Sequence, residues 1–305
     1  MKTIETVGRS DPSELDAPAI TRAAGPVVYF DGHFALKEDV RISPDDRGFL
    51  LGDGVYEVAA AYDGNFIALD RHLDRLRRSL GEARIEDSVA DPLETVFQEL
   101  LERNDLAAKG KAMVYLQVTR GVAPRTHAFP KSRIRPTVYG FAAPFPDMGD
   151  LDAGVKVITR PDRRWSRCDI KSISLMANCL ANQEAKESGA FEAILIRDGI
   201  ALEGTHTSFF AVMDDQVLTA PLSPLILPGI TRAIVLELCR SDGITVSEQH
   251  IPETSLSGAS ELFLTGTTTE VLPIISINGN RVGDGKPGPV TLRLEALYRS
   301  SLGIA

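Results

Sequence analysis

The chain has 305 residues, a net charge of -9 and a hydrophobic fraction of 43%, which are ordinary values for a globular protein with a sizeable core. No basic run is interleaved with aromatic residues, which argues against a nucleic-acid partner. No stretch approaches the ~20 apolar residues of a membrane span, and residues 1–20 lack the apolar segment of a signal peptide, so we expect a cytoplasmic protein without a membrane partner. The three cysteines form no CxxC pair, and the sequence predicts neither a disulfide framework nor a metal site.

The first predicted domain begins after a polar, aperiodic extension of residues 1–26. Asp31-Gly32 and Asp63-Gly64 each separate two strand-like runs, and the Asp-Gly pair is typical of the two-residue turn of a β-hairpin. A helix is predicted after the second hairpin, because leucines recur every three or four residues at Leu69, Leu73, Leu76 and Leu80.

A second helix and two more strands complete this domain, which we expect to span residues 27–145. Asp91 followed by Pro92 is typical of a helix start, and the apolar face beyond it consists of Leu93, Val96, Phe97, Leu100 and Leu101. Strands are predicted on either side of residues 121–134, which read GVAPRTHAFPKSRI. A loop of that length inside a compact domain is more often functional than idle.

The second predicted domain, residues 153–305, follows a linker at residues 146–152, where proline and glycine occur without periodicity. It begins with a strand, continues with a helix that ends at a glycine, and then alternates short strands with turns. The turns are predicted at Asp198-Gly199, Asp214-Asp215 and Asn278-Gly279, and further helices begin near Pro228 and Pro289. The sequence thus predicts an α+β fold of two domains with largely antiparallel sheets.

Lys171 and Glu203 are candidates for chemistry. Lys171 follows Ile170 in a setting that is unusually apolar for a lysine. Burial favours the neutral amine of a lysine, which is the form that makes a Schiff base. Glu203 ends an apolar strand, where a carboxylate could hold a cationic ring nitrogen. Spacing alone favours simpler interpretations, namely a surface lysine at a strand end and a glutamate that solvates a turn.

Two stretches are suited to binding an anion. PGIT, residues 228–231, opens a helix whose free N–H groups and dipole attract negative charge. TGTTTE, residues 265–270, follows a strand and offers hydroxyl groups and close backbone approach. Neither stretch matches the Walker or the dinucleotide-binding pattern, and both are also common as structural punctuation.

Four further polar residues could bind a carboxylate or a phosphate. Arg75 lies on the leucine-rich helix, where periodicity favours a solvated basic face. Arg125 and His127 lie two residues apart in the long loop, and Tyr56 lies far upstream. An arginine can bind a carboxylate through two parallel hydrogen bonds, and histidine and tyrosine can add donors. Random loop polarity explains these residues equally well.

Taken in order, these segments resemble the D-amino acid transaminases. This group lies within the fold type IV branch of pyridoxal-phosphate enzymes, together with branched-chain aminotransferases and aminodeoxychorismate lyases. The resemblance runs from about residue 27 to residue 298 and is carried by DDRGFLLGDGVYE, HLDRL, QVTRGVAPRTHAFP, RWSRCDIKS, LEGTHTS, LPGITR and TGTTTE. It implies a smaller N-terminal domain and a larger C-terminal domain with a mostly antiparallel, barrel-like sheet.

The resemblance also implies a cofactor site for pyridoxal 5'-phosphate. It assigns to Lys171 the Schiff base with the cofactor and the transfer of the substrate's α-proton. It assigns to Glu203 the contact with the pyridine nitrogen, which keeps the ring protonated as an electron sink. The implied phosphate site consists of Arg75, Ile230, Thr231, Gly266 and Thr267.

Tyr56, Arg125 and His127 match the residues that hold the substrate α-carboxylate in this group, where the Arg/His loop reaches over from a second subunit. The resemblance therefore implies a homodimer that transfers an amino group from a D-amino acid, such as D-alanine, to a 2-oxo acid, such as 2-oxoglutarate. An (R)-selective amine transaminase, a branched-chain aminotransferase and a lyase are alternatives within the superfamily. A binding protein without chemistry is another alternative, against which the retention of Lys171 and Glu203 argues.

The sequence departs from the D-amino acid transaminase pattern at three places. Residues 205–208 read THTS where the bacterial enzymes carry a serine-rich run, so His206 and Thr207, together with Arg47, are candidate pocket residues. Gly266 replaces a common serine, which removes a hydroxyl group but leaves the amide donor. The N-terminal extension has no counterpart.

Overall fold

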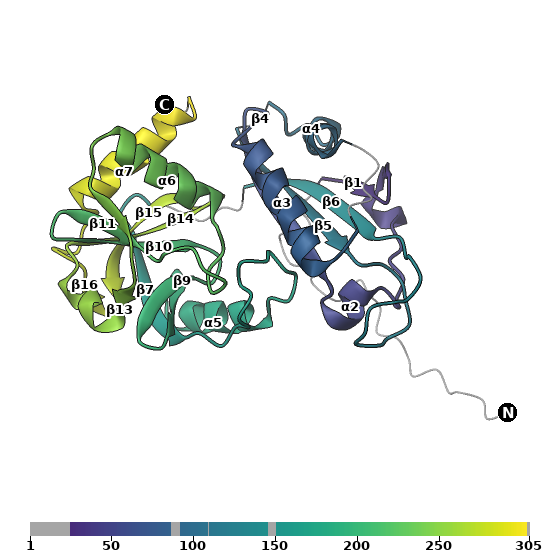
Figure 1. Cartoon of the computed structure of the whole chain (residues 1–305). Coiled ribbons are helices and arrows are strands. Elements are labelled where there is room, and N and C mark those ends of the chain that lie inside the picture. Colours follow the sequence, from purple (N-terminus) through teal and green to yellow (C-terminus); the bar gives the residue numbers. More distant parts are fainter. Residues whose placement is uncertain (1–24, 87–91, 109, 146–150, 304–305) are drawn as a thin grey trace.

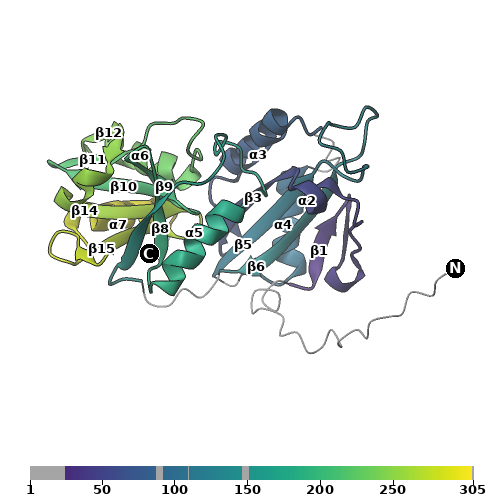
Figure 2. The ribbon, with the colours of Figure 1, turned by 90° about the horizontal axis from the view of Figure 1, so that it is seen from below.

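The computed structural model describes residues 25–86, 92–108, 110–145 and 151–303. Two α/β units lie side by side, and each is built on its own β-sheet with its own helices (Figures 1 and 2). The first unit comes from the first half of the chain and the second unit from the second half. The predicted linker at residues 146–152 lies mostly outside the described residues, so the exact domain boundaries stay a prediction.

The smaller unit is a six-stranded sheet with the strand order β2-β1-β6-β5-β3-β4, in which every neighbouring pair is antiparallel. Both predicted hairpins are confirmed, since Asp31-Gly32 and Asp63-Gly64 have the positive φ angles that such turns require. The strands are β1 (Val27–Phe30), β2 (His33–Leu36), β3 (Gly54–Tyr62), β4 (Asn65–Phe66), β5 (Lys111–Thr119) and β6 (Thr137–Pro144).

Two predicted helices pack on this sheet, namely α3 (Leu69–Ala83) and α4 (Leu93–Arg103). Leu73, Leu76 and Leu80 of α3 and the predicted apolar face of α4 are buried in one cluster with side chains of β3, β5 and β6, and the partly buried Leu69 packs against it. Pro92 occupies the N-cap position of α4, while Asp91 lies outside the described residues. The short helix α2 (Arg47–Leu51), capped by Asp46, was not predicted. A 3-10 turn (Lys37–Asp39) precedes it.

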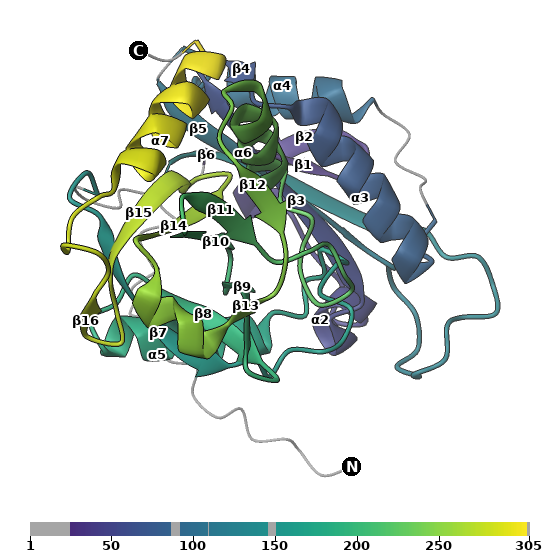
Figure 3. The same cartoon turned by 60° about the vertical axis from the view of Figure 1, so that its left-hand side comes forward.

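The larger unit is a ten-stranded sheet that curls round until β9 meets β10, where Glu203 pairs with Ser208. Figure 3 looks into the ring formed by β7–β10, β14 and β15. Most pairs are antiparallel, but β7 runs parallel to both β8 and β15, and β11 runs parallel to β12. The predicted α+β fold and its barrel-like sheet are confirmed. The strands are β7 (Val155–Pro161), β8 (Glu192–Arg197), β9 (Ile200–Gly204), β10 (Ser208–Met213), β11 (Gln216–Thr219), β12 (Val246–Glu248), β13 (Ile251–Pro252), β14 (Glu261–Gly266), β15 (Glu270–Ile277) and β16 (Asn280–Arg281).

Three predicted helices lie on the outside of this sheet. α5 (Met176–Glu187) packs against β8, whereas α6 (Ile230–Ser241) and α7 (Pro289–Ser301) share a second cluster with β10 and β14. The six ring strands, together with β11 and β13, contribute apolar side chains to a further buried cluster. A 3-10 helix (Glu253–Gly258) follows β13. None of the helices in the described ranges is long and apolar enough to cross a membrane.

Of the contacts that join the units, two sets bear most directly on the site. In the first set, residues 170–173 cross from the larger unit and pair with the start of β3. The N–H of Tyr56 donates to the carbonyl oxygen of Lys171 at 2.9 Å, and the N–H of Ile173 donates to the carbonyl oxygen of Gly54 at 3.1 Å. Ile170 joins the apolar core of the smaller unit. The backbone on both sides of Lys171 is therefore fixed by the other unit.

In the second set, Glu270 at the start of β15 binds side chains of β3 and β5. The Tyr62 hydroxyl donates to its carboxylate at 2.7 Å, and the Lys111 ammonium forms an ion pair with the same oxygen. Arg299 of α7 contacts the other oxygen at 3.4 Å. Burial by itself would raise the pKa of Glu270, but Lys111 and Tyr62 hold it below its ordinary value. Glu270 is thus a charged clamp between the two units.

We expect Glu270→Gln to lower the free energy of unfolding by about 1–3 kcal/mol, because a buried donor and a cation lose their charged acceptor. A carboxyl group whose pKa is depressed by folding stabilises above its unfolded pKa of about 4.3 and loses this effect as the pH falls through the folded value. In thermal unfolding curves, the difference in stability between wild type and Glu270→Gln should be largest at neutral pH and should decrease below about pH 4.

Glu99→Gln is the matched control, since Glu99 pairs with Arg103 at the surface of α4. It should cost less than about 0.5 kcal/mol. An equal loss of stability in both variants would show that Glu270 stabilises the protein no more than a surface ion pair does.

Candidate active site

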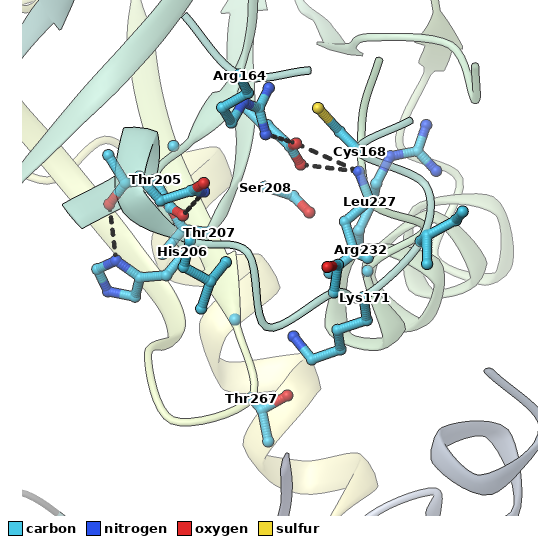
Figure 4. Close-up of a pocket in the computed structure, with 18 of the residues that line it drawn as sticks. Arg164, Cys168, Lys171, Thr205, His206, Thr207, Ser208, Leu227, Arg232 and Thr267 are labelled. Carbon is cyan, nitrogen blue, oxygen red and sulfur yellow. Dashed lines mark hydrogen bonds and ion pairs between the residues drawn. The ribbon is translucent and has the colours of Figure 1, made fainter. Parts of the chain in front are cut away.

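A pocket lies where the two units meet and is lined by Tyr56 of β3 and Arg75 of α3 together with segments of the larger unit. Figure 4 shows part of its lining. The pocket brings together most of the residues singled out in the sequence. These are Tyr56, Arg75, Lys171, Glu203, His206, Thr207, Ile230, Thr231, Gly266 and Thr267. Arg47, Arg125 and His127 are not among the lining residues.

Lys171 projects its ammonium group into this pocket (Figure 4). The residue lies in the irregular segment between β7 and α5, and it is half-buried. Its Nζ lies 4.4 Å from the centre of the Tyr56 ring. No carboxylate among the described residues pairs with it. An amine that faces a pocket and an aromatic ring, rather than water and a counterion, is placed for reaction with a bound molecule.

Glu203 is buried in the pocket wall at the end of β9, with 5% of its surface exposed. Its carboxylate accepts a hydrogen bond from the N–H of Leu227 at 3.1 Å and pairs with the Arg164 guanidinium. Burial raises the pKa of Glu203, and the charge of Arg164 opposes this shift only in part. The interpretation of Glu203 as a solvated turn residue is therefore wrong.

Arg164 was not predicted as a site residue, and nothing in the RRWSR run distinguishes it from its neighbours. Its guanidinium also binds Asp162 at 2.9 Å, so it lies between two buried carboxylates. Arg197 contacts Asp162 from the other side at 2.9 Å. This alternation of charges compensates in part for the desolvation of Glu203.

Arg75 is buried rather than solvated, and the interpretation based on periodicity is wrong for this residue. Its Nε and Nη2 donate to the two carboxylate oxygens of Glu57 at 2.7 and 2.9 Å, and its Nη1 donates to the carbonyl oxygen of Pro228 at 3.0 Å. His72 contacts the same carboxylate through Nδ1 at 2.9 Å. Burial would raise the pKa of Glu57, but Arg75 and His72 lower it to about 2. The Glu57 carboxylate thus fixes Arg75 beside the start of α6.

The donors around the start of α6 fit a phosphate group. Gly229 is the N-cap of α6 and provides no side-chain cap, so the N–H groups of Ile230 and Thr231 have no acceptor within the helix. A Cβ atom at Gly229 would lie 2.6 Å from the Ser208 hydroxyl, so a larger residue would crowd this corner. The buried hydroxyl of Thr265 lines the same pocket and has no hydrogen-bond partner among the described atoms. Backbone donors, an orphan hydroxyl and the Arg75 cation are the chemistry that binds phosphate.

Glu192, another residue that was not predicted, binds the side chains of the THTS run, residues 205–208. Its fully buried carboxylate accepts hydrogen bonds from the hydroxyls of Thr205 at 2.6 Å and Thr207 at 3.2 Å, and it pairs with His206 at 2.8 Å. Burial would raise the pKa of Glu192, but His206 and Thr205 lower it to about 2. The His206 ring is half-exposed and also contacts Thr205 (Figure 4). The run is therefore a rigid part of the pocket wall.

A second hollow adjoins the pocket and shares with it the wall formed by Trp165, Ile170, Ser172 and Ser174. His127 and Arg47 line this second hollow. Arg125 is exposed and lines neither. Within one chain, the three residues expected to bind a carboxylate are thus separated, with only Tyr56 in the pocket.

Comparison with known proteins shows the family. The family model for class IV amino-transferases matches residues 54–277. A D-alanine aminotransferase from Bacillus licheniformis is 40% identical over 278 residues, which cover 90% of this chain and 96% of that protein. One from Staphylococcus haemolyticus is 37% identical over 270 residues, which cover 88% and 95%. The structure of the T.th. branched-chain amino acid aminotransferase with pyridoxamine 5'-phosphate matches with a TM-score of 0.82 and 26% identity, covering 91% of this chain and 94% of that one.

The chain therefore belongs to the class IV aminotransferases. It is a pyridoxal-phosphate-dependent enzyme of fold type IV, and the predicted family, cofactor and reaction class are confirmed. The roles of the individual site residues stay predictions.

We expect Glu57→Gln to destabilise the protein by about 3–5 kcal/mol, because it leaves the buried Arg75 guanidinium without its counter-charge. The stabilisation by Glu57 should be complete above its unfolded pKa of about 4.3 and be lost as the pH falls toward about 2. Urea unfolding of the cofactor-loaded protein at several pH values measures both effects.

Glu237→Gln is the control, because Glu237 of α6 also pairs with an arginine of α3, Arg71, but at the surface. Its cost should stay below about 1 kcal/mol. A Glu57→Gln variant as stable as this control would contradict the buried pairing.

Proposed function

We propose that this aminotransferase is a D-amino acid transaminase, which moves the amino group of a D-amino acid such as D-alanine to a 2-oxo acid such as 2-oxoglutarate. The observation that carries the proposal is one pocket that joins Lys171, the buried Glu203 and an anion-binding corner at the start of α6. The relatives with the highest identities quoted above are D-alanine aminotransferases, which favours D-amino acids as substrates.

Lys171 and Glu203 divide the chemical work in this proposal. When bound, pyridoxal phosphate supplies an electron sink that accepts charge from the α-carbon of the amino acid. Lys171 binds the cofactor through its amine and carries the proton that leaves and returns at the α-carbon. Glu203, held by Leu227 and Arg164, presents a carboxylate to the ring nitrogen.

The phosphate of the cofactor is proposed to lie at the start of α6. Arg75, oriented by Glu57, supplies a positive charge, and backbone N–H groups supply hydrogen bonds. The residues assigned to this site are Arg75, Ile230, Thr231, Gly266 and Thr267. The unpaired Thr265 hydroxyl adds a donor in the same corner.

The substrate carboxylate is proposed to be held by residues of two copies of the chain. Tyr56 lines the pocket, but Arg125 lines neither the pocket nor the hollow beside it, so the described part of one chain does not bring this arginine to the carboxylate. A homodimer in which Arg125 and His127 reach the partner's pocket supplies this residue. Large apolar side chains left exposed at the surface, as is typical of an interface, are Phe49 at 76%, Met176 at 74% and Leu180 at 58%. The cytoplasmic location stays a prediction.

A comparison of amino donors tests the proposed substrate class. With 2-oxoglutarate as acceptor, D-alanine should be a better donor than L-alanine, L-leucine and (R)-1-phenylethylamine, and chiral chromatography should identify the product as D-glutamate. Preference for L-leucine would instead define a branched-chain aminotransferase. Preference for (R)-1-phenylethylamine would define an amine transaminase.

Chemical labelling tests the role of Lys171. Borohydride reduction of the cofactor-loaded enzyme and peptide mapping should locate the pyridoxyl group on Lys171, because its amine faces the pocket. Lys171→Ala should abolish turnover and labelling, whereas Lys186→Ala, on the surface of α5, should retain both. A pyridoxyl group on a different lysine would overturn the assignment.

Substitution of Arg125 tests the carboxylate site. Arg125→Ala should weaken binding of D-alanine and 2-oxoglutarate by about 2–5 kcal/mol, through the loss of a charge-assisted pair, and leave the absorbance of the bound cofactor unchanged. Arg133→Ala, in the same loop and paired with Glu86 at the surface, is the control and should leave KM unchanged. Loss of the cofactor from Arg125→Ala would argue for a role in the loop structure instead.

A further inference from the structure

The loop that carries Arg125 and His127 begins with backbone contacts to the short helix α2. The N–H of Arg47 donates to the carbonyl oxygen of Gly121 at 3.0 Å, and the N–H of Ala123 donates to the carbonyl oxygen of Asp45 at 3.3 Å. Asp46 forms an isolated β-bridge with Val122 between them. These contacts fix the first residues of the loop but end before Arg125.

The Arg47 side chain binds the next part of the loop, beside Arg125. Its Nη1 donates to the carbonyl oxygen of Thr126 at 2.6 Å, and Thr126 is the residue between Arg125 and His127. Its Nε donates to Asp53 at 2.8 Å. Arg47 is 2% exposed, so this guanidinium is held in one place by packing as well as by charge. A buried arginine thus binds the peptide unit at the centre of the predicted carboxylate site.

A second arginine, Arg120, contacts the loop two residues beyond His127, at Phe129. The Arg120 guanidinium forms two hydrogen bonds with Asp53, at 2.8 and 2.9 Å, and it lies 3.7 Å from the centre of the Phe129 ring. The same guanidinium donates to the carbonyl oxygens of Ala83 and Arg84, which ties it to the end of α3. One carboxylate therefore joins two arginines that contact the loop on either side of His127.

The environment of Asp53 keeps this bridge charged. Burial would raise the pKa of its carboxyl group, but the hydrogen bonds of Arg120 and Arg47 hold it below the ordinary value. The two arginines joined by Asp53 do not contact the pocket around Lys171, because neither Arg47 nor Arg120 lines it. Its contacts toward the predicted substrate site run through the loop, at Thr126 and Phe129.

We propose that Arg47 and Arg120, joined through Asp53, are positioning residues for recognition of the substrate carboxylate, since they fix the backbone on which Arg125 and His127 are mounted. The inference rests on the proposed role of Arg125. A loop held at Thr126 and Phe129 presents Arg125 in one orientation, and the ordering cost of binding a substrate is reduced accordingly. Loosening the loop should therefore raise KM for carboxylate substrates more than it lowers kcat.

Arg47→Lys and Phe129→Leu test the proposal from the two ends. A lysine keeps the positive charge but cannot bind Asp53 and Thr126 at the same time with the fixed geometry of a guanidinium. KM for D-alanine and for 2-oxoglutarate should rise by about tenfold in Arg47→Lys, by loss of a charge-assisted hydrogen bond, with a smaller rise in Phe129→Leu. The absorbance of the bound cofactor should not change in either variant. Arg133→Lys, in the same loop but exposed, is the matched control and should retain the wild-type KM.

A double-mutant cycle with Arg125→Ala separates positioning from general stability. If Arg47 acts through Arg125, Arg47→Lys should have little further effect on KM once Arg125 is removed. Additive effects, or an unchanged KM in both Arg47→Lys and Phe129→Leu while Arg125→Ala is impaired, would overturn the inference and leave the proposed function intact. An unchanged KM in Arg125→Ala itself would instead overturn the proposed carboxylate site. If Arg47→Lys does not fold, the same cycle with Phe129→Leu, a half-exposed residue, gives the decision.

Discussion

Backbone hydrogen bonds between residues 170–173 and the start of β3 hold Lys171 at the junction of the two units, and the geometry of the site depends on them. Ile170 is buried in the smaller unit, although its segment comes from the larger one. The lysine therefore cannot move with one unit alone. Its amine faces a wall built from β9, the start of α6 and the turn after β14, while Tyr56 covers it from β3. The Glu270 clamp ties that turn to the same smaller unit.

Paired charges make such a polar pocket possible inside the protein. An isolated buried carboxylate is costly, and each one here has a cation or several donors from another element. Glu57 holds Arg75, Arg164 holds Glu203, and Glu192 holds the THTS run. In each case the buried partner orients a group that faces the pocket. Asp53 is paired in the same way outside the pocket, because it binds the two arginines that contact the loop carrying Arg125.

Local signals in the sequence predicted the helices, strands and turns but not the buried charge pairs. Asp-Gly turns, the leucine stripe of α3 and the Pro-Gly start of α6 act over a few residues, and the structure confirms them. The burial of Arg75 depends on Glu57, which lies on a strand 18 residues earlier, so helical periodicity alone favoured a solvated arginine. Glu57 itself offered a signal, as a charged residue within the apolar run of β3. Arg164 and Glu192 were missed because Glu203, Thr205 and Thr207, which they bind in the pocket wall, lie 13 or more residues later in the sequence. The family resemblance, by matching motifs, named most of the pocket residues, but it missed Arg164 and it also named Arg125 and His127, which do not line the pocket.

The central claim is that one chain provides Lys171 and the cofactor pocket while a second chain provides Arg125. Mixed dimers formed from Lys171→Ala chains and Arg125→Ala chains, isolated by two different affinity tags, test it most directly. In such a dimer one of the two sites combines an intact Lys171 with an intact Arg125 from the partner copy, so about half of the wild-type activity toward D-alanine should return at a substrate concentration near the wild-type KM. If both residues of a site came from the same chain, every site in the mixed dimer would carry one substitution, and activity no higher than that of the Arg125→Ala dimer would contradict the account.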